Sequence, residues 1–161
     1  MKWVKVKHAS PAVQKYHLVD GTEKKLELKY THPQQSVRIS NEIGQRVFFV
    51  EKKGFWTNKT LFKNEYGVEA GKMTVEKGFH AGSIEVDGHK YHYLIHDTPS
   101  PALVIYDELS NPLLHCELNA EYKQGQDLSS LLLGLCWYLC PVVPGQAVAP
   151  RAAGIAAKVT E

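Results

Sequence analysis

The chain has 161 residues, the usual size of one domain, and is long enough to bury a core without a metal or a disulfide. Apolar residues make up 43% and charged residues 22%, which excludes a chain that is disordered throughout. The formal net charge is +2, but residues 1–80 hold 15 Lys and Arg against 8 Asp and Glu, whereas residues 81–161 hold 4 against 9. This asymmetry indicates an anionic partner for the first half, although solvated strand faces rich in lysine would give the same counts.

The cysteines and the start of the chain bear on the compartment. Cys116, Cys136 and Cys140 are an odd number without the spacing of a disulfide framework. The first residues lack the apolar stretch of a secretory signal. We therefore expect reduced thiols in a cytoplasmic protein.

Short alternating or aromatic and β-branched segments recur along the chain, separated by polar turns such as Asn64-Glu65-Tyr66-Gly67. The clearest hairpin surrounds Asp87-Gly88, because this dipeptide accepts the positive φ angles of a tight turn. No strand–helix–strand rhythm is present, so we expect antiparallel pairing. About twelve strands are predicted, in chain order Lys2–Val6, Tyr16–Val19, Lys25–Tyr30, Ser36–Ile39, Arg46–Glu51, Gly54–Thr57, Thr60–Asn64, Glu69–Val75, Ser83–Val86, His89–His96, Leu103–Tyr106 and Leu113–Leu118.

The segment Leu128–Val143 differs from the rest, because it is apolar and carries no charge. It predicts a helix over residues 127–140, which Pro141 ends. A helix that is apolar on every side must be covered on every side. It is shorter than the roughly 20 apolar residues that span a bilayer, which favours burial in protein.

A closed barrel is the β-structure that can cover such a helix all round, and about twelve strands enclose a lumen wide enough to hold it. The predicted fold is therefore all-β: a closed, antiparallel barrel of about twelve strands around a buried, hydrophobic C-terminal helix. We expect one domain over residues 1–143, followed by a flexible tail over residues 144–161.

This combination of strand order, hairpins such as Tyr16–Gly21 and the helix around Leu131–Leu139 resembles the tubby C-terminal-like superfamily. That superfamily includes the tubby-like proteins, the phospholipid scramblases and the LURP-one-related proteins. The resemblance implies a twelve-stranded barrel around a hydrophobic helix, from about Tyr16 to Val143. The chain lacks the C-terminal signature of tubby proteins and a calcium segment of the scramblase kind, so it is most similar to the LURP-one-related branch or a bacterial relative of it.

The basic half suggests one candidate binding surface. Lys52, Lys53, Lys59 and Lys63 crowd around a turn that also contains Trp56. Aromatic side chains beside lysines suit a membrane interface, and the tubby branch that the chain resembles binds phosphoinositide head groups through basic barrel residues. We expect these five residues to bind anionic phospholipid head groups, although the same residues also suit an ordinary barrel wall. A nucleic-acid partner is not expected.

Catalytic and metal-binding patterns are weak. His92 and His96 share a strand face but lie about 13 Å apart, and His89 faces the other way, so they fit surface histidines better than a metal site. Cys136 and Cys140 share a helix face and fit buried thiols. No nucleophile elbow, phosphate loop, dinucleotide fingerprint or zinc-protease motif is present. We therefore expect no enzyme, no metal and no cofactor.

Three functions fit these patterns. The first is a non-enzymatic barrel that binds anionic phospholipid at a basic surface, which would make a cytoplasmic protein membrane-peripheral. The second is a structural or protein-interaction barrel without a small ligand. The third is a membrane-anchored protein that inserts Leu128–Val143 into lipid.

Overall fold

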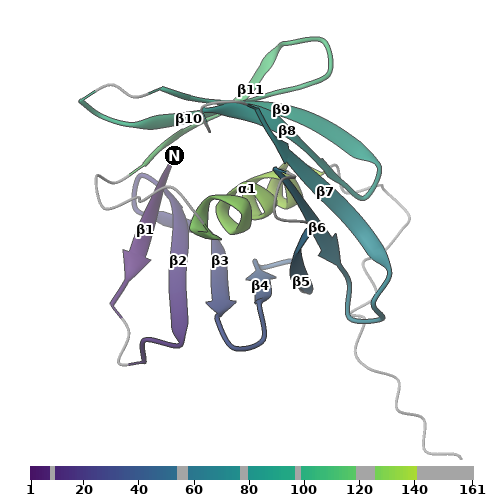
Figure 1. The fold of residues 1–161 in the computed structure, drawn as a ribbon. Coiled ribbons are helices and arrows are strands. Elements are labelled where there is room, and N and C mark those ends of the chain that lie inside the picture. The colour runs from purple at the N-terminus through teal and green to yellow at the C-terminus, as the bar shows by residue number, and fades with distance from the viewer. Residues whose placement is uncertain (8–9, 54–57, 77–79, 97–98, 119–125, 141–161) are drawn as a thin grey trace, which may run out of the picture.

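A computed structural model describes residues 1–7, 10–53, 58–76, 80–96, 99–118 and 126–140. Figure 1 shows these residues as a wall of strands around one helix, α1 (Gln126–Leu139). The strands are β1 (Lys2–Val6), β2 (Val13–Asp20), β3 (Glu23–Thr31), β4 (Ser36–Ser40), β5 (Gln45–Lys53), β6 (Lys59–Lys63), β7 (Glu69–Val75), β8 (Ala81–Val86), β9 (His89–His96), β10 (Ala102–Tyr106) and β11 (Pro112–Glu117).

The strands form a closed barrel in which each strand pairs with its neighbour in the chain. All of these neighbouring pairs are antiparallel, but the closing pair of β1 with β11 is parallel and joins Lys2 to Glu117. The reason is parity. In an up-and-down meander of eleven strands the first and the last run in the same direction, so they can meet only in parallel.

The predicted closed barrel around a C-terminal helix is confirmed. Eleven of the predicted strands are present with small shifts in their ends, and the twelfth, Gly54–Thr57, lies outside the described residues. The predicted antiparallel pairing is present in every pair but the closing one, β1 with β11, which is parallel because a meander of eleven strands brings its first and last strands together in the same direction. The predicted helix over 127–140 begins and ends one residue earlier, and the predicted tail over 144–161 lies outside the described residues.

Alternation along each strand separates the core from the outer wall. On β3, Leu26, Leu28 and Tyr30 are buried, whereas Glu27 and Lys29 point outward. Successive side chains of a strand point to opposite faces, so the apolar set lines the lumen. The same alternation places Val37 and Ile39 of β4 in the core and Arg38 outside.

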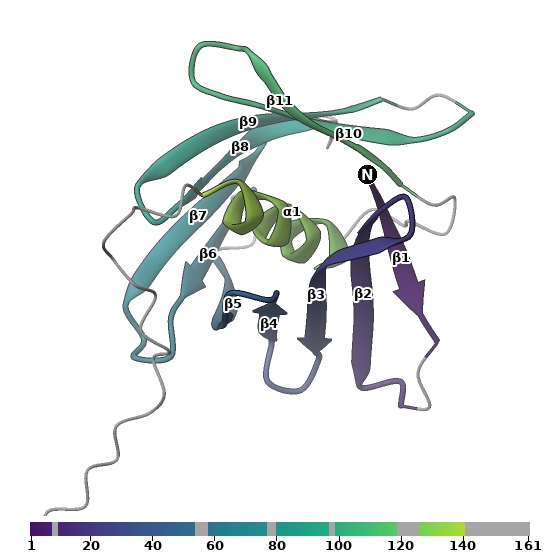
Figure 2. The same cartoon turned by 180° about the vertical axis from the view of Figure 1, so that it is seen from behind.

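Helix α1 fills the lumen. Leu131, Leu132, Leu133, Leu135 and Cys136 are completely buried. Figures 1 and 2 show strands on both sides of the helix, with β2 to β5 on one side and β8 to β11 on the other. None of the described helices is long and apolar enough to cross a membrane. The leucines of α1 pack against the wall of the barrel.

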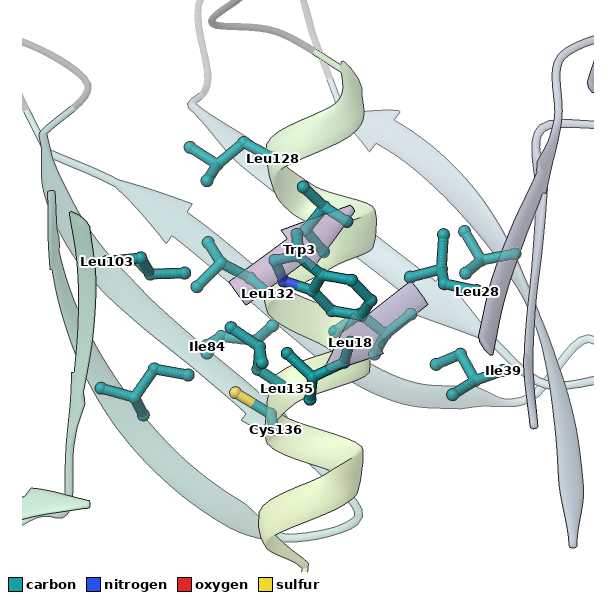
Figure 3. Close-up of a cluster of buried hydrophobic side chains, with 14 of the residues drawn as sticks. Trp3, Leu18, Leu28, Ile39, Ile84, Leu103, Leu128, Leu132, Leu135 and Cys136 are labelled. Atoms are coloured by element: carbon teal, nitrogen blue, oxygen red, sulfur yellow. The ribbon is translucent and has the colours of Figure 1, made fainter. Parts of the chain in front are cut away.

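The helix approaches the wall most closely at Gly134. A Cβ atom at this position would lie 3.1 Å from Cδ1 of Leu28 and 3.3 Å from Cη2 of Trp3. Figure 3 shows Trp3 lying across the helix, with Leu132 and Leu135 beside it. The absence of a side chain at Gly134 therefore lets the helix pack directly on β1 and β3.

The meander gives the barrel two distinct ends. The connections after β2, β4, β6, β8 and β10 are tight turns, and we call this end the turn end. The connections after β1, β3, β5, β7 and β9 lie at the opposite end, which we call the loop end. Segments far apart in the sequence therefore share an end whenever their strands differ by an even number.

Tyr91 and Tyr93 of β9 are both buried in the core, but their hydroxyl groups have different surroundings. The Tyr91 hydroxyl faces the thiol of Cys140 just beyond α1, and burial together with this thiol raises the pKa of Tyr91. The Tyr93 hydroxyl is buried and has no hydrogen-bond partner among the described residues, and burial, reinforced by the charge of Glu76, raises the pKa of Tyr93 to about 12. An unpaired buried hydroxyl reduces stability, whereas a paired one contributes to it.

We predict that Leu132→Ala or Leu135→Ala lowers the free energy of unfolding by about 2–5 kcal/mol, because each removes buried methyl groups and leaves a cavity. Urea denaturation would measure this. The control Leu109→Ala changes a side chain that is 83% exposed and should have almost no effect. Equal effects at the three positions would contradict the central place of α1.

We predict opposite effects for the two tyrosines. Tyr93→Phe removes an unpaired hydroxyl and should raise the free energy of unfolding by about 1–3 kcal/mol. Tyr91→Phe removes a hydroxyl that faces the polar thiol of Cys140 and should lower it by about 0.5–1.5 kcal/mol. Denaturant unfolding of both variants and of the wild type measures the two changes in the free energy of unfolding. A loss of stability in Tyr93→Phe would show that the Tyr93 hydroxyl is paired.

Candidate functional site

Three of the four predicted lysines lie together at the loop end. Lys52 and Lys53 end β5, and Lys59 begins β6. Lys53 and Lys59 are direct partners across the two strands, and all three side chains are exposed. The fifth predicted residue, Trp56, lies outside the described residues.

Lys63 does not belong to this group. It ends β6 on the side of the turn end, four residues or about 13 Å along the strand from Lys59. Its ammonium group forms an ion pair with Glu51, and the hydrogen bond from Lys63 holds the pKa of Glu51 below its ordinary value. The structure therefore does not bring Lys63 together with the other three lysines, because the length of β6 separates it from Lys59.

The structure adds a second basic feature, on the outer wall of β2, β3 and β4. Lys15 pairs across the strands with Lys29, and Lys29 pairs with Arg38. Side chains of direct partners in a sheet lie about 5 Å apart at Cβ. Three cations therefore form one row around the barrel, which we call the basic row.

Glu27 is the carboxylate nearest to the basic row. Its oxygens lie 2.9 Å from Nζ of Lys15, 3.1 Å from Nε2 of His17 and 3.7 Å from Nζ of Lys24. Partial burial acts to raise the pKa of Glu27, but the hydrogen bonds from Lys15 and His17 outweigh it and hold the pKa below 4.5. One carboxylate thus serves three basic groups, so it cannot neutralise the row.

Lys29 and Arg38 are exposed and form no ion pair within the described part of the chain, and the same holds for Lys52, Lys53 and Lys59. Like charges placed directly opposite each other in a sheet are unfavourable. The wall holds two such pairs, Lys29 with Arg38 and Lys53 with Lys59, without a carboxylate bridge. An anion placed between the members of either pair would relieve the repulsion.

The two ends of the barrel differ in charge. At the loop end the exposed lysines are Lys5 and Lys7 of the β1 side and those of β5 and β6, and the exposed carboxylates that the structure describes there are Glu76 and Glu117. At the turn end carboxylates prevail. Exposed ones without an ion pair among the described residues are Asp20, Glu42, Glu65, Glu69 and Glu108.

The histidine and cysteine side chains are the remaining candidates for metal binding or nucleophilic chemistry. Within the described ranges no three His, Cys, Asp or Glu side chains are placed to hold a metal ion. Burial raises the pKa of Cys116 to about 12 and raises that of Cys136 well above its ordinary value. Both thiols are therefore protonated and unreactive near neutral pH.

The outer wall also has an open hollow of about 320 Å³ over β8, β9 and β10. His92 and Tyr106 line it as direct partners across β9 and β10, and Leu94 and Ser110 complete part of its rim. The hollow is wide open to solvent, and no hydrogen bond joins His92 to Tyr106 among the described residues. It has neither the enclosure nor the convergent polar groups of a ligand pocket.

No family model, curated protein or solved structure matches this chain. The resemblance to the tubby C-terminal-like superfamily therefore stays a prediction.

The sequence contains a signal for the basic row that net charge alone does not reveal. Lys15, Lys29 and Arg38 each occupy an outward position of an alternating strand. Their alignment depends on the registers of two hairpins, and the first contains an irregularity between Leu18 and Val19 that shifts the pairing. A count of charges by region therefore favours Lys52–Lys63 and does not predict the basic row.

We predict that Glu27→Gln weakens the acid sensitivity of the fold. Because the pKa of Glu27 is lowered on folding, its ion pairs contribute stability above pH 4.5, and this contribution is lost as the pH falls below that value. The difference in unfolding free energy between the wild type and Glu27→Gln should thus narrow between about pH 6 and pH 3. Urea melts across this range would measure it, and Glu42→Gln, which removes a carboxylate without an ion pair, should show no such narrowing.

Proposed function

We propose that this protein is a non-enzymatic binding barrel that docks on anionic phospholipid surfaces through the basic row and the lysines of the loop end. One observation carries the proposal. Cations face each other across neighbouring strands, Lys29 with Arg38 and Lys53 with Lys59, without a carboxylate between them. Phosphate groups between these side chains would replace a repulsion by two attractions.

The expected binding free energy fits a reversible contact with the surface of a membrane. A lysine or arginine near an anionic membrane contributes about 1 kcal/mol, and the attraction falls off within a Debye length of about 8–10 Å. Five exposed cations give a reversible association that salt weakens. The exposed part of Phe49, which is 40% accessible on the wall beside β4, adds an apolar contact at the same side.

The separation of charge between the two ends supports a defined orientation. A molecule with cations at one end and carboxylates at the other turns its basic end toward a negative surface before contact. The loop end and the basic row would then face the lipid, and the turn end would face away from it. Such binding would place the protein at the cytoplasmic face of a membrane.

The resemblance to tubby-like proteins agrees with this proposal, because their barrels bind anionic head groups. The alternative, a structural or protein-interaction barrel without a small ligand, is favoured by the open form of the hollow over β8, β9 and β10, which does not enclose a ligand. The two functions differ in their response to lipid charge, so one experiment separates them.

We predict that the protein co-sediments with vesicles that contain phosphatidylserine, and that neutral vesicles or high salt abolish the binding. Lys29→Glu/Arg38→Glu and Lys52→Glu/Lys53→Glu should each weaken the binding by at least about tenfold, because each pair of changes reverses two charges worth about 1 kcal/mol apiece. Glu27→Gln should strengthen it, because it removes the carboxylate nearest to the row.

The control is Lys90→Glu, which makes half the change in charge of either double variant, at an exposed lysine near the turn end. This variant should bind like the wild type. If Lys90→Glu weakens binding as much as the changes in the row, net charge alone governs the attraction and the proposed surface is wrong. If the wild type ignores anionic vesicles at low salt, the protein-interaction alternative becomes the better account.

A further inference from the structure

Three turns at the turn end share one sequence pattern. They begin Asn41-Glu42-Ile43 between β4 and β5, Asn64-Glu65-Tyr66 between β6 and β7, and Asp107-Glu108-Leu109 between β10 and β11. Each has an Asn or Asp first, a glutamate second and a large apolar residue third. The meander places all three at the same end of the barrel, and the β10–β11 hairpin projects beyond the rest of the wall (Figure 2).

The three turns are also built by the same hydrogen bonds. Oδ1 of the first residue accepts from the backbone N–H of the third residue, at 3.0 Å for Ile43, 3.0 Å for Tyr66 and 2.9 Å for Leu109. A second backbone N–H donates to the same oxygen, from Gly44 or Val68 at 3.0 Å and from Asn111 at 2.8 Å. Turns closed in this way are fixed by the first side chain and the backbone.

These hydrogen bonds do not require an apolar side chain at the third position. Nevertheless Ile43 is 61% exposed, Tyr66 71% and Leu109 83%, the highest values of any large apolar side chain in the described ranges. Val68, in the same turn as Tyr66, is 59% exposed. A large apolar side chain held in water by a rigid turn gains nothing from folding, but it is already ordered for a contact with another molecule.

The glutamate beside each apolar residue defines the chemistry of that contact. Glu42, Glu65 and Glu108 are exposed and form no ion pair with any described residue. The same end carries the ion pair of Arg46 with Asp87, so Arg46 is already neutralised. The complement of each turn is therefore an apolar recess with a lysine or arginine at its edge.

We infer that the turn end is a docking surface for a partner protein that presents apolar recesses flanked by Lys or Arg, with Ile43, Tyr66 and Leu109 as the anchors. An anionic membrane does not fit, because the three glutamates would be repelled by it. A second copy of this chain does not fit either. Two turn ends repel each other, and none of the exposed large apolar residues described lies in a connection of the loop end.

This inference does not rest on the proposed lipid binding, because it uses the opposite end of the barrel. The two activities are compatible in one molecule. A barrel held on lipid through its basic row would present the turn end to the cytoplasm, where a partner can reach it.

A pair of synthetic amphipathic peptides tests the inference. One is built of leucine and lysine, and the other has glutamate in place of every lysine. We expect the lysine peptide to bind the ¹⁵N-labelled protein saturably and to shift the amide signals of residues 42–44, 65–68 and 108–110. The glutamate peptide should leave these signals unchanged.

The variant Ile43→Ser/Tyr66→Ser/Leu109→Ser should weaken binding of the lysine peptide at least about tenfold, since it removes three exposed anchors without touching the hydrogen bonds of the turns. Phe49→Ser, which removes an exposed aromatic ring from the basic wall, should leave it unchanged. Glu42→Gln/Glu65→Gln/Glu108→Gln should remove most of the salt dependence of the binding.

Two results would overturn the inference. The first is peptide-induced shifts that fall elsewhere on the barrel or survive the triple serine variant. The second is self-association of the free protein in sedimentation velocity that the triple serine variant abolishes, which would assign this end to a second copy. Binding to phosphatidylserine vesicles should be unchanged in the triple serine variant, so failure of this inference and failure of lipid binding are distinguishable.

Discussion

The structure depends on the need to cover α1 on every side. Leu131, Leu132, Leu133 and Leu135 face different directions around the helix and all are completely buried. An open sheet covers one side of a helix, whereas a closed wall covers all of them and leaves few strand edges. Trp3 and Gly134 show how closely the wall fits, because the indole ring lies against the helix where a side chain is missing. The central helix therefore explains why a chain of short strands closes into a barrel.

Closure by a meander has a second consequence, which concerns charge. Alternate connections meet at the same end, so turns that are distant in the sequence become neighbours around one rim. Glu42, Glu65 and Glu108 lie at the turn end in this way, spread around the rim, whereas Lys5, Lys7 and Lys53 lie at the loop end. The excess of lysine in the first half of the chain and of carboxylates in the second half is thus only part of the pattern. In the folded protein, basic and acidic side chains are separated along the barrel axis, toward opposite ends.

The two proposed surfaces follow from this separation of charge, and they would bind their partners through different interactions. The basic row and the loop end offer unpaired cations, which suit a diffuse, salt-sensitive attraction to phosphate groups. The turn end offers apolar side chains on rigid turns, which suit a contact that excludes water. Neither proposal uses the core, where the described thiols Cys116 and Cys136 are buried and protonated and the Tyr93 hydroxyl is buried without a described hydrogen-bond partner. The barrel thus acts as a rigid support that holds two surfaces apart.

The sequence by itself determined the strands, the helix and the closed barrel, because these depend on local alternation and on the apolar character of residues 128–139. It also indicated the lysines at Lys52, Lys53 and Lys59, which one connection brings together. Only the tertiary structure decided what depends on register and on parity: the parallel closing pair, the ion pair that removes Lys63 from the site, the row of Lys15, Lys29 and Arg38, and the common end of three similar turns. A shift of one residue in a hairpin moves every side chain to the other face of the sheet, and an irregularity such as that at Leu18 cannot be counted from composition or charge.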